Sequence, residues 1–138
     1  MNRFSNVVAE GMKRVSRDLT AILQSHGFAR TKGGRKWHRA NAQFTESVYL
    51  ERSGCSYGAP LNASISLRLM LSFRPDGEPH GELVDSDMAR RANGYSYHHR
   101  FNAETGSTYD RCVQELGFYI DEVAEPWFEV RRRAFNKR

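Results

Sequence analysis

The feature that most constrains the fold is one long run of alternating side chains. From Leu61 to Phe73 every second residue is apolar, and among the residues between them only Met70 is apolar. Successive side chains of a β-strand point to opposite faces, so the run predicts a strand with one buried and one polar face. Burial on one side is typical of an antiparallel sheet. A shorter run over 44–52 predicts a second strand of the same kind.

Helical spacing replaces this alternation at both ends of the chain. Apolar residues three and four apart predict a helix from about residue 3 to residue 26, which Gly27 ends. A second helix is expected after Gly106, with Ser107 as its N-cap. Pro126 should break or restart that helix, because proline suits a first turn and not a helix interior. The last short helix then carries Trp127, Phe128 and Val130.

The remaining segments complete a small α+β domain. A Gly33-Gly34 turn predicts a tight hairpin over residues 30–39, with Trp37 as its apolar anchor. Alternation over 95–101 predicts another strand, and 84–93 fits either one helical turn or a sheet edge. We therefore expect a single domain over residues 1–138. It has an antiparallel sheet of four to five strands, with a long N-terminal helix and C-terminal helices packed on one face.

The length and composition of the chain indicate which cofactors such a domain requires and in which compartment it functions. With 138 residues, the chain can bury a core without a disulfide or a metal, so we expect no cofactor. Cys55 and Cys112 are its two cysteines, they form no CxxC motif, and both are expected to be reduced. No apolar stretch is long enough for a membrane span or a secretory signal, and we expect a cytoplasmic protein.

The net charge of +5 is unevenly distributed. Residues 1–40 carry +7, residues 41–130 carry −7 and residues 131–138 carry +5. Such polarity arises from a nucleic-acid footprint, or from segments that neutralise each other across a packed interface. The second explanation is the commoner and is favoured here.

Several short motifs occur in the order of a known family. They are Gly27-Phe28, a basic stretch before Trp37, Val48-x-Leu50-x-x-Ser53, the long alternating strand and Pro126-Trp127-Phe128. In this order the chain resembles the bacterial family called domain of unknown function 4304. Glu51 and Arg52 depart from the Gln and Lys more usual there. The resemblance implies a fold and a bacterial setting but no reaction, and small domains of this kind are considered as toxin-neutralising or other partner-binding proteins.

The sequence contains no recognisable catalytic signature. The one GxSxG pattern, Gly54-Cys55-Ser56-Tyr57-Gly58, falls in the loop before the long strand and not at the strand-to-helix turn that a nucleophile elbow requires. The serines of the long strand lie on regular backbone. Metal-compatible groups occur at His80, Glu82, Asp85, Asp87, His98 and His99, without an HExxH motif. A metal-dependent enzyme using His80, Asp85, Asp87 and His98 or His99 is one alternative, but solvated acids and edge histidines are favoured. His98 and His99 should point to opposite faces of their strand.

The basic hairpin provides a second alternative. Cations interleaved with an aromatic ring suit phosphate contact and base stacking. The candidate nucleic-acid-binding residues are Arg30, Lys32, Arg35, Lys36 and Arg39. The favoured interpretation is that Trp37 packs in the core while the cations are solvated. The terminal arginines, from Arg131 onward, are likewise interpreted as a solvated helix end.

The polar sheet face is the preferred binding surface. If helices cover one face, the other presents Thr45, Ser47, Tyr49, Glu51, Asn62, Ser64, Ser66 and Arg68. Tyr49 and Arg68 are the expected anchors of a protein partner, with Glu51, Ser64 and Ser66 around them. The competing interpretation is that Arg68 merely pairs with Glu51. The sequence thus favours a non-enzymatic bacterial binding protein, with immunity-type neutralisation of a toxin as its candidate role, and leaves the oligomeric state open.

Overall fold

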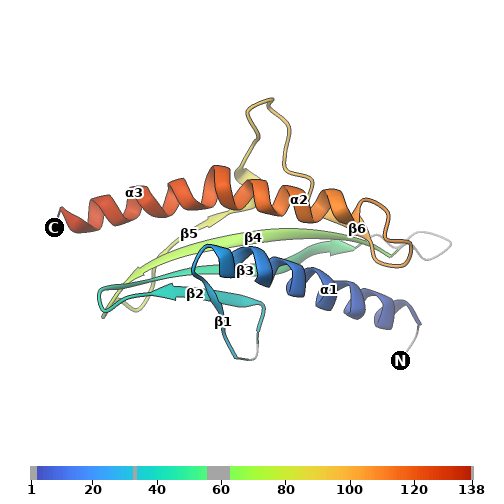
Figure 1. Ribbon diagram of the computed structural model, residues 1–138, viewed down its shortest axis with the longest axis horizontal. Coiled ribbons are helices and arrows are strands. Elements are labelled where there is room, and N and C mark those ends of the chain that lie inside the picture. Colours follow the sequence, from blue (N-terminus) through green and yellow to red (C-terminus); the bar gives the residue numbers. More distant parts are fainter. Residues whose placement is uncertain (1–2, 33, 56–62, 138) are drawn as a thin grey trace.

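A computed structural model describes residues 3–32, 34–55 and 63–137 (Figure 1). Leu61 and Asn62, which the sequence assigns to the long strand and its polar face, lie outside these ranges, as does Gly33. The helical elements are α1 (Arg3–Ser25), η1 (Ser86–Met88), α2 (Tyr109–Tyr119), η2 (Ile120–Ala124) and α3 (Glu125–Asn136). The strands are β1 (Ala29–Arg30), β2 (Lys36–Ala40), β3 (Phe44–Cys55), β4 (Ser64–Pro75), β5 (Glu82–Asp85) and β6 (Arg100–Asn102).

The strands form one antiparallel sheet in the order β1-β2-β3-β4-β5, with β6 also paired to β4. The sheet has six strands, rather than the four to five expected. β4 is long enough to pair with β5 over Met70–Phe73 and with β6 over Ser64–Ser66. The ambiguous stretch 84–93 begins inside the additional strand, because the sheet edge β5 continues directly into the 3-10 turn η1.

All three α-helices pack against one face of this sheet. Leu67, Leu69 and Leu71 of β4 are buried there, together with the apolar stripe of α1. α2, η2 and α3 follow one another as a single rod that runs along the long strands (Figure 1). The α+β architecture predicted from the alternation is therefore confirmed. None of the described helices is long and apolar enough to cross a membrane.

The helix ends agree with the sequence in part. Gly27 has a φ of +85°. Its N–H donates to Gln24 (3.1 Å) and the Phe28 N–H donates to Leu23 (3.0 Å), which is the Schellman pattern expected at the end of α1. The expected N-cap Ser107 is wrong by one position. Thr108 precedes α2 with a φ of 63°. Its one hydroxyl proton is directed at the Ser107 carbonyl (2.7 Å), with the Arg100 carbonyl 3.2 Å away, and the hydroxyl accepts no hydrogen bond from the helix.

Two other expectations change at the edges of the fold. Pro126 restarts the helix rather than breaking it, because the π-helical turn η2 joins α2 to α3 and leaves Pro126 in the first turn of α3. Of the strand expected over 95–101, only the end is paired as β6, although Tyr97, His99 and Phe101 are buried as the alternation requires. Val130 is 57% exposed and does not join Phe128 in the core.

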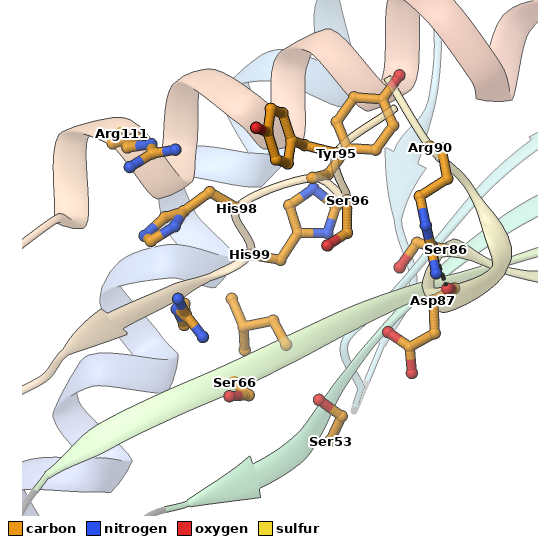
Figure 2. Close-up of a pocket in the computed structure, with 13 residues that line it drawn as sticks. Ser53, Ser66, Ser86, Asp87, Arg90, Tyr95, Ser96, His98, His99 and Arg111 are labelled. Atoms are coloured by element: carbon orange, nitrogen blue, oxygen red, sulfur yellow. Dashed lines mark hydrogen bonds between the residues drawn. The ribbon is translucent and has the colours of Figure 1, made fainter. Parts of the chain in front are cut away.

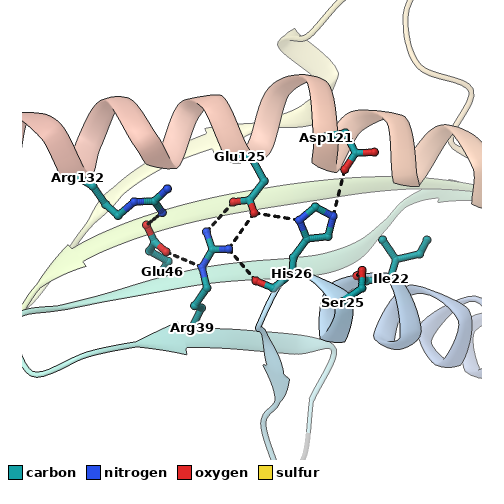
Figure 3. Close-up of polar contacts among 8 residues, drawn as sticks. All are labelled: Ile22, Ser25, His26, Arg39, Glu46, Asp121, Glu125 and Arg132. Atoms are coloured by element: carbon teal, nitrogen blue, oxygen red, sulfur yellow. Dashed lines mark hydrogen bonds and ion pairs between the residues drawn. The ribbon is translucent and has the colours of Figure 1, made fainter.

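A buried carboxylate lies between the sheet and the helical rod (Figure 3). Glu46 of β3 is 1% exposed. One of its oxygens accepts from Arg39 Nε of β2 at 2.7 Å, and the other accepts from Arg132 of α3 at 2.6 Å. Arg39 also donates to both oxygens of Glu125 of α3, at 2.6 and 2.9 Å. Through Arg39, which binds both carboxylates, Glu46 and Glu125 thus join β2 and β3 to α3.

The N-terminal helix is tied to the same cluster. His26, just after α1, places Nδ1 2.9 Å from Glu125 and Nε2 3.1 Å from Asp121. Although burial acts to raise it, the hydrogen bonds from Arg39 and His26 hold the pKa of Glu125 below its ordinary value. The network links the basic N-terminal segment, the acidic middle and the basic C-terminus. The favoured explanation of the charge polarity, neutralisation across a packed interface, is confirmed for these groups.

Removal of the Glu46 carboxylate is expected to destabilise the fold strongly. Glu46→Ala leaves the partly buried Arg39 and Arg132 without their shared acceptor, which should lower the free energy of unfolding by about 3 kcal/mol or more. Denaturant unfolding measures this change. Glu46→Gln keeps the volume and isolates the effect of the charge.

The matched control is Glu129→Ala on the exposed surface of α3, where the carboxylate pairs with Arg133. That change should stay within about 0.5 kcal/mol of the wild type. Equal effects of the Glu46 and Glu129 substitutions would contradict the role given to Glu46.

Candidate functional site: the helix-free sheet face

The sheet face away from the helices is hollowed where β2, β3, β4 and β5 lie side by side. This depression, the sheet-face hollow, has a volume of about 460 Å³. None of the described residues that line it is acidic. It is lined by Lys36, His38, Ala40, Thr45, Ser47, Tyr49, Ser72, Arg74, Pro79, His80, Gly81 and Leu83. The hollow is therefore a preformed cationic surface with several hydroxyl groups.

Tyr49, the first expected anchor, lies in this hollow. Its register neighbours are Lys36 on β2 and Met70 on β4. The Lys36 ammonium lies 4.8 Å from the Tyr49 ring centre, within the range of a cation–π interaction. The ring is half-buried between these neighbours. Tyr49 thus presents a held, oriented aromatic surface.

Arg68, the second expected anchor, is already engaged within the sheet. Its Nε and Nη2 atoms donate to one oxygen of Glu51, at 3.0 and 2.8 Å, and its Nη1 donates to Asp85 at 3.1 Å. The hydrogen bonds to Glu51 and the charge of Asp85 raise the pKa of Arg68. The competing interpretation, in which Arg68 pairs with Glu51, is therefore correct. It did not include the second partner, Asp85. Arg68 is therefore a weaker candidate anchor than Tyr49.

The two expected serines lie toward the other end of β4. Ser64 is opposite Asn102 and Ser66 is opposite Arg100 in the register with β6. Ser66 lines a second depression and is not one of the residues that line the sheet-face hollow. The five expected partner-binding residues share one sheet face but do not converge on one site.

A histidine–serine pair inside the sheet-face hollow was not predicted from the sequence. His38 Nδ1 lies 2.8 Å from Ser47 Oγ. Burial and the charges of Lys36 and Arg74 lower the pKa of His38. The register of β2 with β3 could have predicted the pair, because alternation places both side chains on the polar face.

This pair lacks the parts of a nucleophilic dyad. Among the described residues no carboxylate contacts His38 to orient the imidazole, and the nearby cations oppose the imidazolium that a general base must become. Ser47 lies on regular β3 backbone, whose amides pair with β2 and β4 and are not arranged as an oxyanion hole. The arrangement suits hydrogen bonding to a ligand better than catalysis.

The basic hairpin forms, but its cations do not make one surface. Arg39 faces the helices, where its guanidinium is held by Glu46 and Glu125. Lys36 is on the opposite face, over Tyr49. The guanidinium of Arg30 lies 6.0 Å from the ring of the fully buried Trp37. The exposed cations of the hairpin are Arg30, Lys32 and Arg35.

The C-terminal arginines differ in the same way from their interpretation as solvated. Arg132 binds the buried Glu46, and Arg131 donates to Glu82 at 2.9 Å while lying over the Trp127 ring. Arg133 is the exposed member, with 74% of its side chain accessible. The helical period of α3 therefore decides which arginine side chains turn toward the sheet, whereas the run of charge in the sequence does not.

The metal-compatible residues do not assemble into a site. Among the described residues, no group of three His, Cys, Asp or Glu side chains could hold a metal ion. His80 lines the sheet-face hollow, whereas Asp85 binds Arg68. Asp87, His98 and His99 line the second depression. The two histidines precede β6 and share this depression, so the expectation that they point to opposite faces of a strand is not met.

His99 is a core residue. It is 7% exposed, stacks on Tyr97 and meets the edge of the Tyr119 ring. Its Nε2 lies 3.3 Å from the Glu115 carbonyl oxygen. Burial lowers the pKa of His99 to about 4. His99 therefore enters the fold as a neutral ring.

Known protein families, curated proteins and solved structures were compared with this chain, and none gave a significant match.

The buried His99 should make stability depend on pH. The unfolded chain takes up a proton near the ordinary histidine pKa of 6.5, whereas folded His99 does so only near pH 4. Its contribution is therefore complete above pH 6.5 and is lost as the pH falls toward 4. Relative to His99→Phe, the wild type should lose about 2 kcal/mol of unfolding free energy between about pH 6.5 and 4.5.

Urea unfolding at several pH values measures this difference. The exposed His80, changed to Gln, is the control and should leave the pH profile of the wild type unchanged. A His99→Phe profile parallel to the wild type would show that His99 does not enter the fold as a neutral ring.

Proposed function

We propose that this chain is a non-enzymatic binding protein that receives a protein partner on its helix-free sheet face. The single observation that supports this proposal most is the sheet-face hollow, a preformed polar surface with an oriented Tyr49 and no acidic lining residue among those described. A rigid, partly aromatic depression of this kind supports recognition, because few side chains need ordering on contact.

The charge of the hollow specifies the chemistry of the partner. Lys36 and Arg74 line it together with His38 and His80. A complementary surface therefore carries carboxylates, because the positive charges in the hollow attract acidic partners and repel basic ones. Leu83, 61% exposed, adds an apolar contact at the β5 side. The partner is thus an acidic protein surface with an apolar neighbour.

The biological role belongs to the same proposal. We propose an immunity-type role in a bacterial cytoplasm, in which the sheet face neutralises a toxin by covering an acidic part of its surface. Membership of the family called domain of unknown function 4304 remains a proposal based on the short motifs around Trp37 and Pro126-Trp127-Phe128.

The product of a toxin-like reading frame beside this gene is the partner to test. Calorimetry should show binding that the double variant Tyr49→Ala with Arg68→Ala weakens by more than about 2 kcal/mol. Lys36→Gln with Arg74→Gln should also weaken it and make it less dependent on salt. Each variant is expected to fold, because these side chains lie on the face away from the core.

The control is Lys13→Gln with Arg17→Gln, which removes the same charge from the exposed side of α1. It should leave the affinity unchanged within about 0.5 kcal/mol. No binding of the neighbouring product, or equal losses in the control and the hollow variants, would refute the proposal.

Nucleic acid is the competing partner, and salt dependence distinguishes it. Binding of short DNA or RNA at low salt, with a steep salt slope that decreases when Lys32 and Arg35 are changed to Gln, would favour the hairpin over the sheet face. We expect no such slope, because Arg39 is withdrawn from the basic segment into the ion network.

A further inference from the structure

A second depression lies beside β6, under the segment that joins η1 to β6 (Figure 2). This β6 hollow has a volume of about 460 Å³, within the range of sites for small molecules. Its described lining combines residues from β3, β4, the 86–100 segment and α2. It is separate from the sheet-face hollow, and no described residue lines both.

The β6 hollow has an excess of positive charge. Arg90, Arg100 and Arg111 line it, and Asp87 is the one carboxylate among its described lining residues. Arg90 donates to the carbonyl oxygens of Asp87 and Ala89, which hold its position but do not neutralise its charge. Arg100 makes no ion pair with any described residue.

The carboxylate behind the hollow is already shared. Glu115 is 4% exposed and accepts from Arg111 Nε at 3.1 Å and from the His98 backbone N–H at 2.7 Å. Arg91 also lies 3.7 Å from it. One buried carboxylate is thus shared by two arginines and an amide, so it cannot neutralise both arginines, and Arg100 adds a charge with no ion pair among the described residues.

His98 also lines the hollow and carries a ring nitrogen without a hydrogen-bond partner among the described residues. This nitrogen, Nε2, is buried. Burial and the charges of Arg111 and Arg100 lower the pKa of His98. Figure 2 shows the His98 ring on the same side of the hollow as Arg111. A bound oxyanion in the hollow would offset the charges of Arg100 and Arg111.

The rest of the lining suits a larger molecule than a simple ion. Ser53, Ser66 and Ser96 bring hydroxyl groups to the hollow, and Tyr95 lines it with 74% of its surface exposed. Hydroxyls match the hydroxyls of a sugar, and an exposed aromatic ring offers a surface for stacking a flat base. We propose that the β6 hollow binds a phosphorylated small molecule of the nucleoside monophosphate class, with its phosphate between Arg100, Arg111 and His98.

Calorimetry in a phosphate-free buffer of low ionic strength tests this site with three probes. Adenosine 5′-monophosphate should bind more tightly than inorganic phosphate, and adenosine should bind least, because the guanidinium groups hold the phosphate. Arg100→Gln and Arg111→Gln should each weaken nucleotide binding about tenfold. Tyr95→Ala should weaken nucleotide binding and leave phosphate binding unchanged.

The matched control is Arg133→Gln, which removes the same charge from an exposed position on α3. It should change each affinity less than about twofold. Thermal unfolding of every variant verifies that the exposed Arg100 and Arg111 can be replaced without loss of the fold.

Each other outcome is decisive. Equal affinity for phosphate and the nucleotide would overturn the nucleoside part and identify free phosphate as the ligand. Absence of binding to both, or binding that Arg100→Gln leaves intact, would overturn the site as a whole. A single-stranded oligonucleotide that binds far more tightly, through Lys32 and Arg35, would assign the anion chemistry to the hairpin instead.

Discussion

The fold depends on one carboxylate that lies where an apolar side chain would be expected. Glu46 is held by arginines from β2 and α3, and through Arg39 it is connected to Glu125 and His26. Burial of a charge is unfavourable unless partners surround it, so the helical rod has one angular setting on the sheet that satisfies all of them. The apolar core stabilises packing of the helices, whereas these charges specify where the helices lie.

Much of this architecture could be predicted from alternation, because every second residue of a strand lies on the same face of the sheet. The alternation over β4 predicted its buried and polar faces, and helical spacing predicted α1 to within one or two residues at either end. Glu46 has the parity of Phe44 and Val48, as Arg39 has that of Trp37, so both inward charges were visible in the sequence. Arg39 was expected among the solvated cations of the hairpin because charged residues are mostly exposed, and Glu46 was given no position.

The residues that line the two hollows were less predictable, for a physical reason. The pairing of Glu51 with Arg68 follows from two strands in register, and it was anticipated. Arg100, Arg111 and His98 come together only because β6 and α2 pack against each other across a turn. No local pattern encodes that approach. Likewise, Met70, the apolar residue on the polar face, lies between Tyr49 of β3 and Asp85 of β5. The sequence of β4 alone does not indicate these neighbours.

The shortness of the outer strands limits how another molecule can attach. β1 has two residues and β5 has four, so these margins offer few unpaired backbone groups in a row, whereas β3 continues through residues 51–55 past the end of its pairing with β2. Strand addition, in which a foreign peptide extends a sheet, needs a longer template. β1 and β5 are therefore poor templates for strand addition, and their shortness limits edge-to-edge aggregation along these two strands.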